Sequence, residues 1–112
     1  MSSAWGRFID ARLATVNVGI LRVILHLPRS GSLKAKRQVI AGLLKRLRTE
    51  FGVAAAEVGD GNRWQIAELG IACVSNDARH ADEFLARVVT FVEARAGDAV
   101  VAKVSTEVLK LS

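Results

Sequence analysis

The residues best suited to chemistry in this chain are the basic side chains of PRSGSLKAKR, Pro28 to Arg37. Two serines precede a leucine, as at a helix start, yet the first turn would carry Lys34, Lys36 and Arg37 and no carboxylate. Each cation there opposes the helix dipole by roughly 0.3–1 kcal/mol. Free N–H groups beside basic side chains are, however, what a helix start offers to phosphate. The stretch therefore predicts an anion-binding surface.

The positive charge of the chain is concentrated in this region. Residues 28–50 hold seven cations and one acid, a net +6, whereas the other 89 residues hold nine cations and ten acids. A local excess of this kind indicates an anionic partner more directly than the overall charge of +5 does.

On a helical wheel of 100° per residue, four cations form a stripe beside the apolar side of the expected helix. The stripe and the preceding loop give the candidate anion- or RNA-binding residues, which are Arg29, Ser30, Ser32, Lys34, Arg37, Lys45 and Arg48. The alternative interpretation is an ordinary solvated charged face.

Lys36 differs from the other cations because the same wheel places it within the apolar arc. A lysine there must either extend past the end of the sheet or meet a carboxylate. Strand parity directs Glu57 to the face that the helices cover, near the start of the basic helix. We therefore predict a structural ion pair between Lys36 and Glu57.

Six elements would position these residues. Hydrophobic period and turn residues predict strands at Val16–Leu27, Val53–Val58, Trp64–Ser75 and Val100–Leu111, and helices at Ser32–Phe51 and from Asn76 or Asp77 to Gly97. The order β-α-β-β-α-β with right-handed crossovers gives a ferredoxin-like α+β fold. Its four-stranded antiparallel sheet has the order 4-1-3-2 and carries both helices on one face.

Composition and length indicate one domain at residues 16–112 and an N-terminal extension at residues 1–15. In the extension, Trp5, Phe8, Ile9 and Leu13 are spaced for a short amphipathic helix. The single cysteine, Cys73, excludes an internal disulfide, and no apolar run reaches the roughly 18 residues that cross a bilayer. We expect a cytoplasmic protein without membrane, metal or cofactor.

The sheet face that the helices leave uncovered is the second candidate surface. Strand parity and the hairpin assign to it Arg22, Ile24, His26, Arg63 and Trp64. Aromatic and basic groups on an open sheet can hold single-stranded RNA, whereas exposed apolar residues favour a protein interface or self-association. A small-molecule enzyme using His26, Glu57, Arg63 and Trp64 is a third reading, but no catalytic motif supports it.

Two long runs of the sequence resemble a known family. HLPRSGSLKAKRQVIAGLLKRLRTEFGVAAAEV and WQIAELGIACVSNDARHADEFLARVVTFVE, with the blocks SLKAKR, WQ-x-AELG and VSND, are similar to the YlxP-like family of small bacterial domains of unknown function. The resemblance covers about Val18 to Leu109. It implies a ferredoxin-like fold and, in many bacteria, a gene among translation and ribosome-maturation genes, but no established activity. Ala35 stands where the family usually has an acid, and Ile66 where it often has a basic residue.

These observations lead to two hypotheses. The first is a non-enzymatic accessory protein that binds RNA or a ribosomal particle through the basic helix, without DNA sequence specificity. The alternative is a homodimeric or protein-interaction module that uses the uncovered sheet face.

Overall fold

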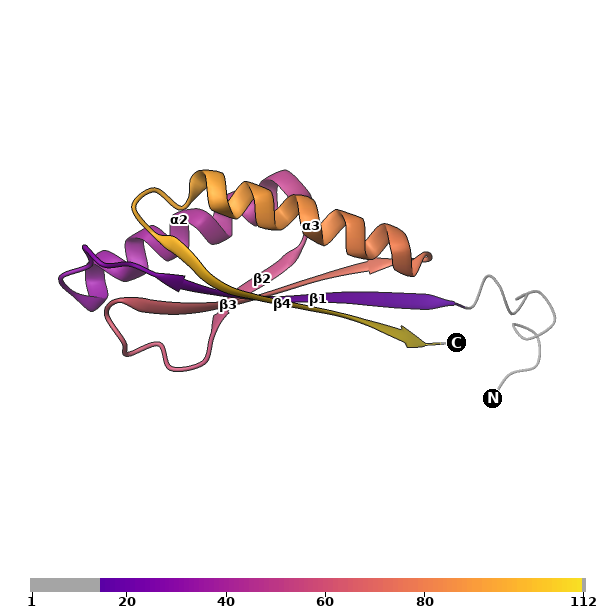
Figure 1. The fold of residues 1–112 in the computed structure, drawn as a ribbon, viewed down its shortest axis with the longest axis horizontal. Coiled ribbons are helices and arrows are strands. Elements are labelled where there is room, and N and C mark those ends of the chain that lie inside the picture. The colour runs from indigo at the N-terminus through magenta and orange to yellow at the C-terminus, as the bar shows by residue number, and fades with distance from the viewer. Residues whose placement is uncertain (1–14, 112) are drawn as a thin grey trace.

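The chain folds into strands and helices in the predicted order (Figure 1). The computed structural model describes residues 15–111. The elements are β1 (Val16–His26), α2 (Leu33–Phe51), β2 (Ala54–Val58), β3 (Ile66–Ser75), α3 (Ala78–Arg95) and β4 (Val100–Leu111).

The strands form one antiparallel sheet of order β2-β3-β1-β4, with β1 and β3 at its centre. Both helices cover the same face of this sheet, and the opposite face is open (Figure 1). The ferredoxin-like α+β fold and the strand order 4-1-3-2 are therefore confirmed.

The core lies between the covered face of the sheet and the two helices. Alternate residues of each central strand point inward, and helical residues spaced three or four apart meet them. The fully or nearly buried side chains include Leu21, Val23, Leu25, Ile40, Leu44, Leu47, Leu69, Ile71, Leu85, Val88 and Val92. This layer fixes which side chains of β1 and β3 face the open side.

Capping residues set the start of each helix. The Ser32 hydroxyl accepts from the Ala35 N–H at 3.0 Å at the start of α2. The Asp77 carboxylate accepts from the N–H groups of Arg79 and His80 at the start of α3, so Asp77, and not Asn76, is the cap. At the end of α2, Gly52 takes the left-handed conformation and donates its N–H to Arg48 O.

The start of β3 differs from the prediction. The expected strand began at Trp64, but β3 begins at Ile66, so Trp64 lies in the β2–β3 connection. β2 pairs with β3 only as far as Val58 opposite Glu68, and the Ile66 carbonyl accepts a side-chain hydrogen bond from Lys36 instead. The connection between β2 and β3 accordingly spans residues 59–65.

Within residues 15–111 no helix is long and apolar enough to cross a membrane. The amphipathic helix expected around Trp5, Phe8, Ile9 and Leu13 lies outside the described residues.

Gly19 on β1 offers a test of this packing. A Cβ at this position would lie 2.9 Å from Leu85 Cδ1 and 3.0 Å from Cys73 Sγ. We expect Gly19→Val to lower the free energy of unfolding by about 1–3 kcal/mol through overpacking, measured by urea denaturation. Gly42→Ala is the control, because a Cβ there meets no atom within 4 Å, and it should raise stability by about 0.5–1 kcal/mol. An unchanged midpoint for Gly19→Val would contradict the packing of α3 on β1.

Candidate functional site

Lys36 is fully buried at the start of α2, on the side that faces the sheet. Its Nζ donates to Gly61 O at 2.8 Å and to Ile66 O at 3.3 Å, and it lies 3.0 Å from Glu57 Oε2. Glu57 Oε2 is buried and makes no hydrogen bond of good geometry, so it is stabilised by charge attraction to the ammonium group. The structure thus brings together Lys36 and Glu57, the two residues that the sequence analysis predicted to form an ion pair.

These contacts clamp the first turn of α2 to the β2–β3 connection. A second set of bonds joins that connection to the segment after β1: Leu27 N–H donates to Gln65 O at 2.8 Å, and Gln65 Nε2 donates to Pro28 O at 3.1 Å. We call residues 27–37 and 59–65 together the loop end, which lies at the left of Figure 1. The β2–β3 connection is therefore held by hydrogen bonds both to α2 and to the segment after β1.

Three cations of the predicted stripe remain available to a partner. Lys34, Arg37 and Lys45 are exposed on α2, and no carboxylate within residues 15–111 pairs with them. Because α2 has no acid in its first turn, nothing on the helix itself offsets Lys34 and Arg37. This exposed side of α2, with Arg29 beside it, is the basic face.

Other members of the predicted set have internal partners. The Arg48 guanidinium donates to Ala55 O and so ties the end of α2 to β2. Ser32 caps the helix, and the Ser30 hydroxyl donates to Ser32 O at 3.1 Å. These three residues therefore help to shape the helix ends; Ser30 and Ser32 are half-buried, whereas Arg48 is exposed while it makes this bond.

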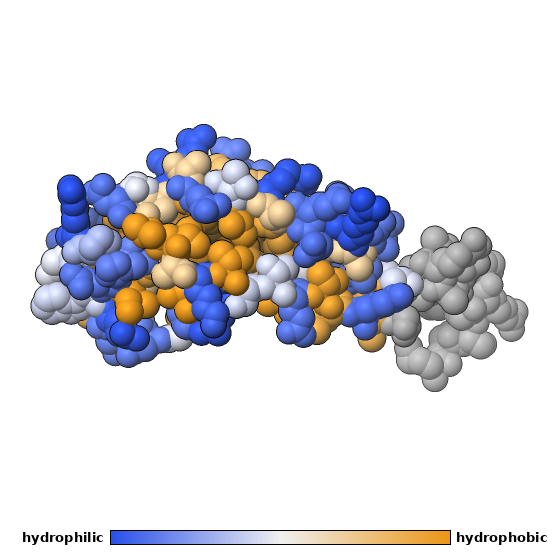
Figure 2. Space-filling view, viewed as in Figure 1, coloured by the Kyte–Doolittle hydropathy of each residue, from blue (hydrophilic) through white to orange (hydrophobic). Residues whose placement is uncertain are grey.

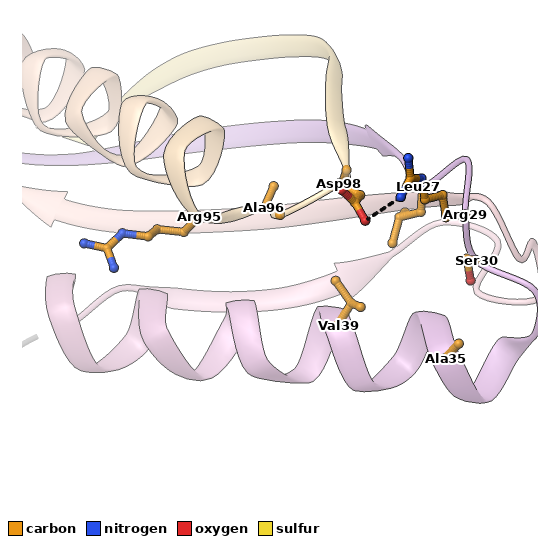
Figure 3. A pocket seen from close by; sticks show the side chains of 10 residues that line it. Leu27, Arg29, Ser30, Ala35, Val39, Arg95, Ala96 and Asp98 are labelled. Carbon is orange, nitrogen blue, oxygen red and sulfur yellow. Dashed lines mark ion pairs between the residues drawn. The ribbon is translucent and has the colours of Figure 1, made fainter.

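Arg29 lies at the mouth of a cleft of about 320 Å³ between the start of α2 and the end of α3 (Figure 3). One wall carries Ala35 and Val39, and the other is the segment 96–99. Arg29 Nη1 is 3.9 Å from Asp98 Oδ2, and both side chains are largely exposed. A pair in water contributes little, so Arg29 can exchange this contact for a phosphate.

The open-face candidates separate into two groups. Arg22 pairs with Glu68 at 2.7 Å across β1 and β3, and Ile24 is half-buried beside it. His26, Arg63 and Trp64 instead lie together around one hollow at the loop end, although Trp64 is not on the strand. The sequence analysis therefore grouped Trp64 correctly with His26 and Arg63. It placed Trp64 on the third strand, whereas the residue lies in the β2–β3 connection.

An apolar cluster at the other end of the open face was only partly predicted. Ile20, Val74, Leu109 and Leu111 are 38%, 75%, 47% and 70% exposed. The register places Val18 between Val74 and Leu109, so the cluster crosses three strands. The sequence alone does not give the pairing register, through which β1 brings residues of β3 and β4 together in this cluster.

Figure 2 shows that hydrophilic residues predominate at the loop end and that further apolar surface lies between α3 and β4.

Two groups with chemical potential lie elsewhere. Half-buried Cys73 and exposed His80 line a hollow of about 210 Å³ beside the start of α3. No set of three His, Cys, Asp or Glu side chains within residues 15–111 is placed to hold a metal ion.

Comparison with known proteins identifies the family. The sequence model described as "Protein of unknown function (DUF503)" matches residues 18–106. This chain belongs to the DUF503 family. An "Uncharacterized protein YlxP" of Bacillus subtilis (strain 168) is 38% identical to this DUF503 protein over 64 residues, which are 57% of this chain and 70% of that relative. The YlxP-like resemblance is thus confirmed.

Among solved structures, "De novo designed protein Foldit4" is similar to this DUF503 protein with a TM-score of 0.45 and 13% identity. The likeness covers 87% of this chain and 97% of that one.

The Lys36 clamp can be tested by stability measurements. Lys36→Met would leave Glu57 without its partner and should lower the free energy of unfolding by roughly 3 kcal/mol. This is at the low end for a broken buried pair because the Glu57 side chain is 22% exposed. The double variant Lys36→Met/Glu57→Gln should lose less than the sum of the single losses. Lys34→Met, two residues away and exposed, is the control and should change stability by less than about 0.5 kcal/mol. Equal effects of Lys36→Met and Lys34→Met would contradict the clamp.

Proposed function

We propose that this DUF503 protein is a non-enzymatic cytoplasmic accessory protein that binds RNA, or an RNA-containing particle such as the ribosome, through the basic face of α2. The observation that carries the proposal is the set of exposed cations Lys34, Arg37 and Lys45, which have no acidic partner within residues 15–111. Arg29 extends the same surface onto the loop before the helix.

The location of the charge favours a polyanion over a small anion. Lys34 and Lys45 are eleven residues apart, which is about 16 Å along a helix that rises 1.5 Å per residue. A nucleic-acid backbone presents phosphates over such a distance, whereas a single phosphate group meets only one end of it. The gene setting that the family resemblance implies, among translation and ribosome-maturation genes, favours RNA as the polyanion.

Binding of this kind would be mainly electrostatic. Cations that contact phosphates release counterions, so affinity falls as salt rises and depends little on sequence. The buried charge of Lys36 takes no part in these contacts, because its three partners, two carbonyl acceptors and the Glu57 carboxylate, are internal.

The triple variant Lys34→Glu/Arg37→Glu/Lys45→Glu tests the basic face. We expect its affinity for total RNA and ribosomal subunits to fall, and the slope of log K against log salt to decrease by about 2, from three lost contacts at ~0.7 each for single strands. Arg79→Glu/Lys103→Glu/Lys110→Glu is the control, because it changes the net charge equally at exposed positions elsewhere. Equal RNA binding by the two triple variants would overturn the proposal, since net charge alone would then explain affinity.

A second candidate is a homodimer formed through the open sheet face. The specific observation is the apolar cluster of Ile20, Val74, Leu109 and Leu111, which crosses three strands without a cover from residues 15–111. Contiguous exposed apolar surface on a small protein marks an interaction site. A second copy would bury it by an isologous contact.

Light scattering of the full chain tests this second candidate. We expect a dimer mass for the wild type and a monomer mass for Val74→Glu/Leu109→Glu, because two buried charges without partners would oppose association. Val39→Glu, on an exposed apolar position of α2, is the control and should keep the dimer. A monomeric wild type would exclude the dimer.

A further inference from the structure

The β2–β3 connection carries an aromatic side chain that is more than half exposed. Trp64 is 55% exposed and borders a hollow of about 450 Å³ at the loop end. The other lining residues are His26, Arg63, Gln65 and Ile66. A tryptophan in the core would stabilise the fold by burial, but this indole leaves more than half of its surface in water.

The exposed indole is carried by a strongly anchored segment. Gln65, the next residue, is bound through its backbone carbonyl to Leu27 N–H and through its side chain to Pro28 O. The carbonyl of Ile66 then accepts from the buried Lys36 ammonium. The hollow is therefore held in place before any ligand arrives, which reduces the entropy lost on binding.

The groups around the hollow indicate the chemistry of its ligand. Trp64 offers a flat apolar surface, Arg63 a cation, and His26 and Gln65 hydrogen-bonding groups, while no carboxylate from residues 15–111 lines the hollow. A ligand with a flat ring and an attached anion could stack on Trp64, pair with Arg63 and form hydrogen bonds with His26 and Gln65. A nucleotide has both parts. Stacking of a base on an aromatic side chain contributes about 1–3 kcal/mol and tolerates any base.

The hollow lies at the same end of the molecule as the start of the proposed RNA surface. Gln65, which lines the hollow, donates to Pro28 O, and Arg29 follows Pro28 in the chain before the first turn of α2. We infer that the hollow beside Trp64 binds an unpaired nucleobase of single-stranded RNA whose phosphates contact Arg63, Arg29 and the basic face. This inference rests on the proposed function and adds selectivity for single strands, because a duplex hides the faces of its bases.

The experiment compares three RNA probes on the full chain: a single-stranded oligonucleotide, a duplex of the same length and free AMP. A Trp5→Phe background leaves Trp64 as the only tryptophan. We expect the single strand and AMP to quench its fluorescence saturably, and ribose 5-phosphate, which has no base, to leave it unchanged. Trp64→Ala should weaken single-strand binding by about 5- to 150-fold and leave duplex binding unchanged. Trp64→Phe, which keeps a stacking surface, should retain most of the affinity.

The outcomes separate the two proposals. One outcome is that the triple variant Lys34→Glu/Arg37→Glu/Lys45→Glu abolishes RNA binding while Trp64→Ala binds the single strand like the wild type. This result would overturn the base site and support RNA binding through the basic face. An equal loss for single strand and duplex in Trp64→Ala also overturns the base site. If AMP quenches Trp64 but no RNA binds, the RNA function fails and the hollow is a site for free nucleotides. A urea midpoint of Trp64→Ala equal to that of the wild type shows that its losses are not due to unfolding.

Discussion

The buried ammonium of Lys36 is the contact on which the geometry of the loop end depends. A charge removed from water costs several kcal/mol unless it is fully paired, and here it meets the Glu57 carboxylate and two backbone carbonyls. These three partners belong to β2, to the β2–β3 connection and to the first residue of β3. One side chain thus fixes three segments to the start of α2.

This contact also explains how the first turn of α2 accommodates several cations. Charge on Lys36 is compensated inside the protein, where it serves structure. The charges of Lys34 and Arg37 face solvent and are compensated by no acid within residues 15–111. The unfavourable interaction of the exposed pair with the helix dipole therefore persists in the free protein, and the anion binding that we propose would relieve it.

Whether a feature of the fold or of the candidate site could be predicted from the sequence depends on whether it arises from local periodicity or from contacts between residues far apart in the chain. The elements and the pairing of Lys36 with Glu57 depend on local periods of two and 3.6 residues, which the sequence displays, and the strand order follows from the element order with right-handed crossovers. The displacement of Trp64 from β3 depends on where β2 stops pairing and on a carbonyl bound by a distant lysine. The bond from Arg48 to Ala55 O and the apolar cluster around Val74 depend likewise on three-dimensional register. The hydrophobic periodicity of the sequence does not predict such long-range contacts.

The open face has two chemically different ends, and their separation would allow the proposed RNA binding and the proposed self-association to coexist. His26 and Ile66 pair at the loop end, whereas Val18 pairs with Val74 in the apolar cluster. Eight residues of β1 separate His26 from Val18, which is roughly 26 Å at ~3.3 Å per residue. A dimer through the apolar cluster would leave both loop ends exposed. Two basic faces on one particle would then bind a long RNA with an avidity that neither has alone, because the second contact is intramolecular.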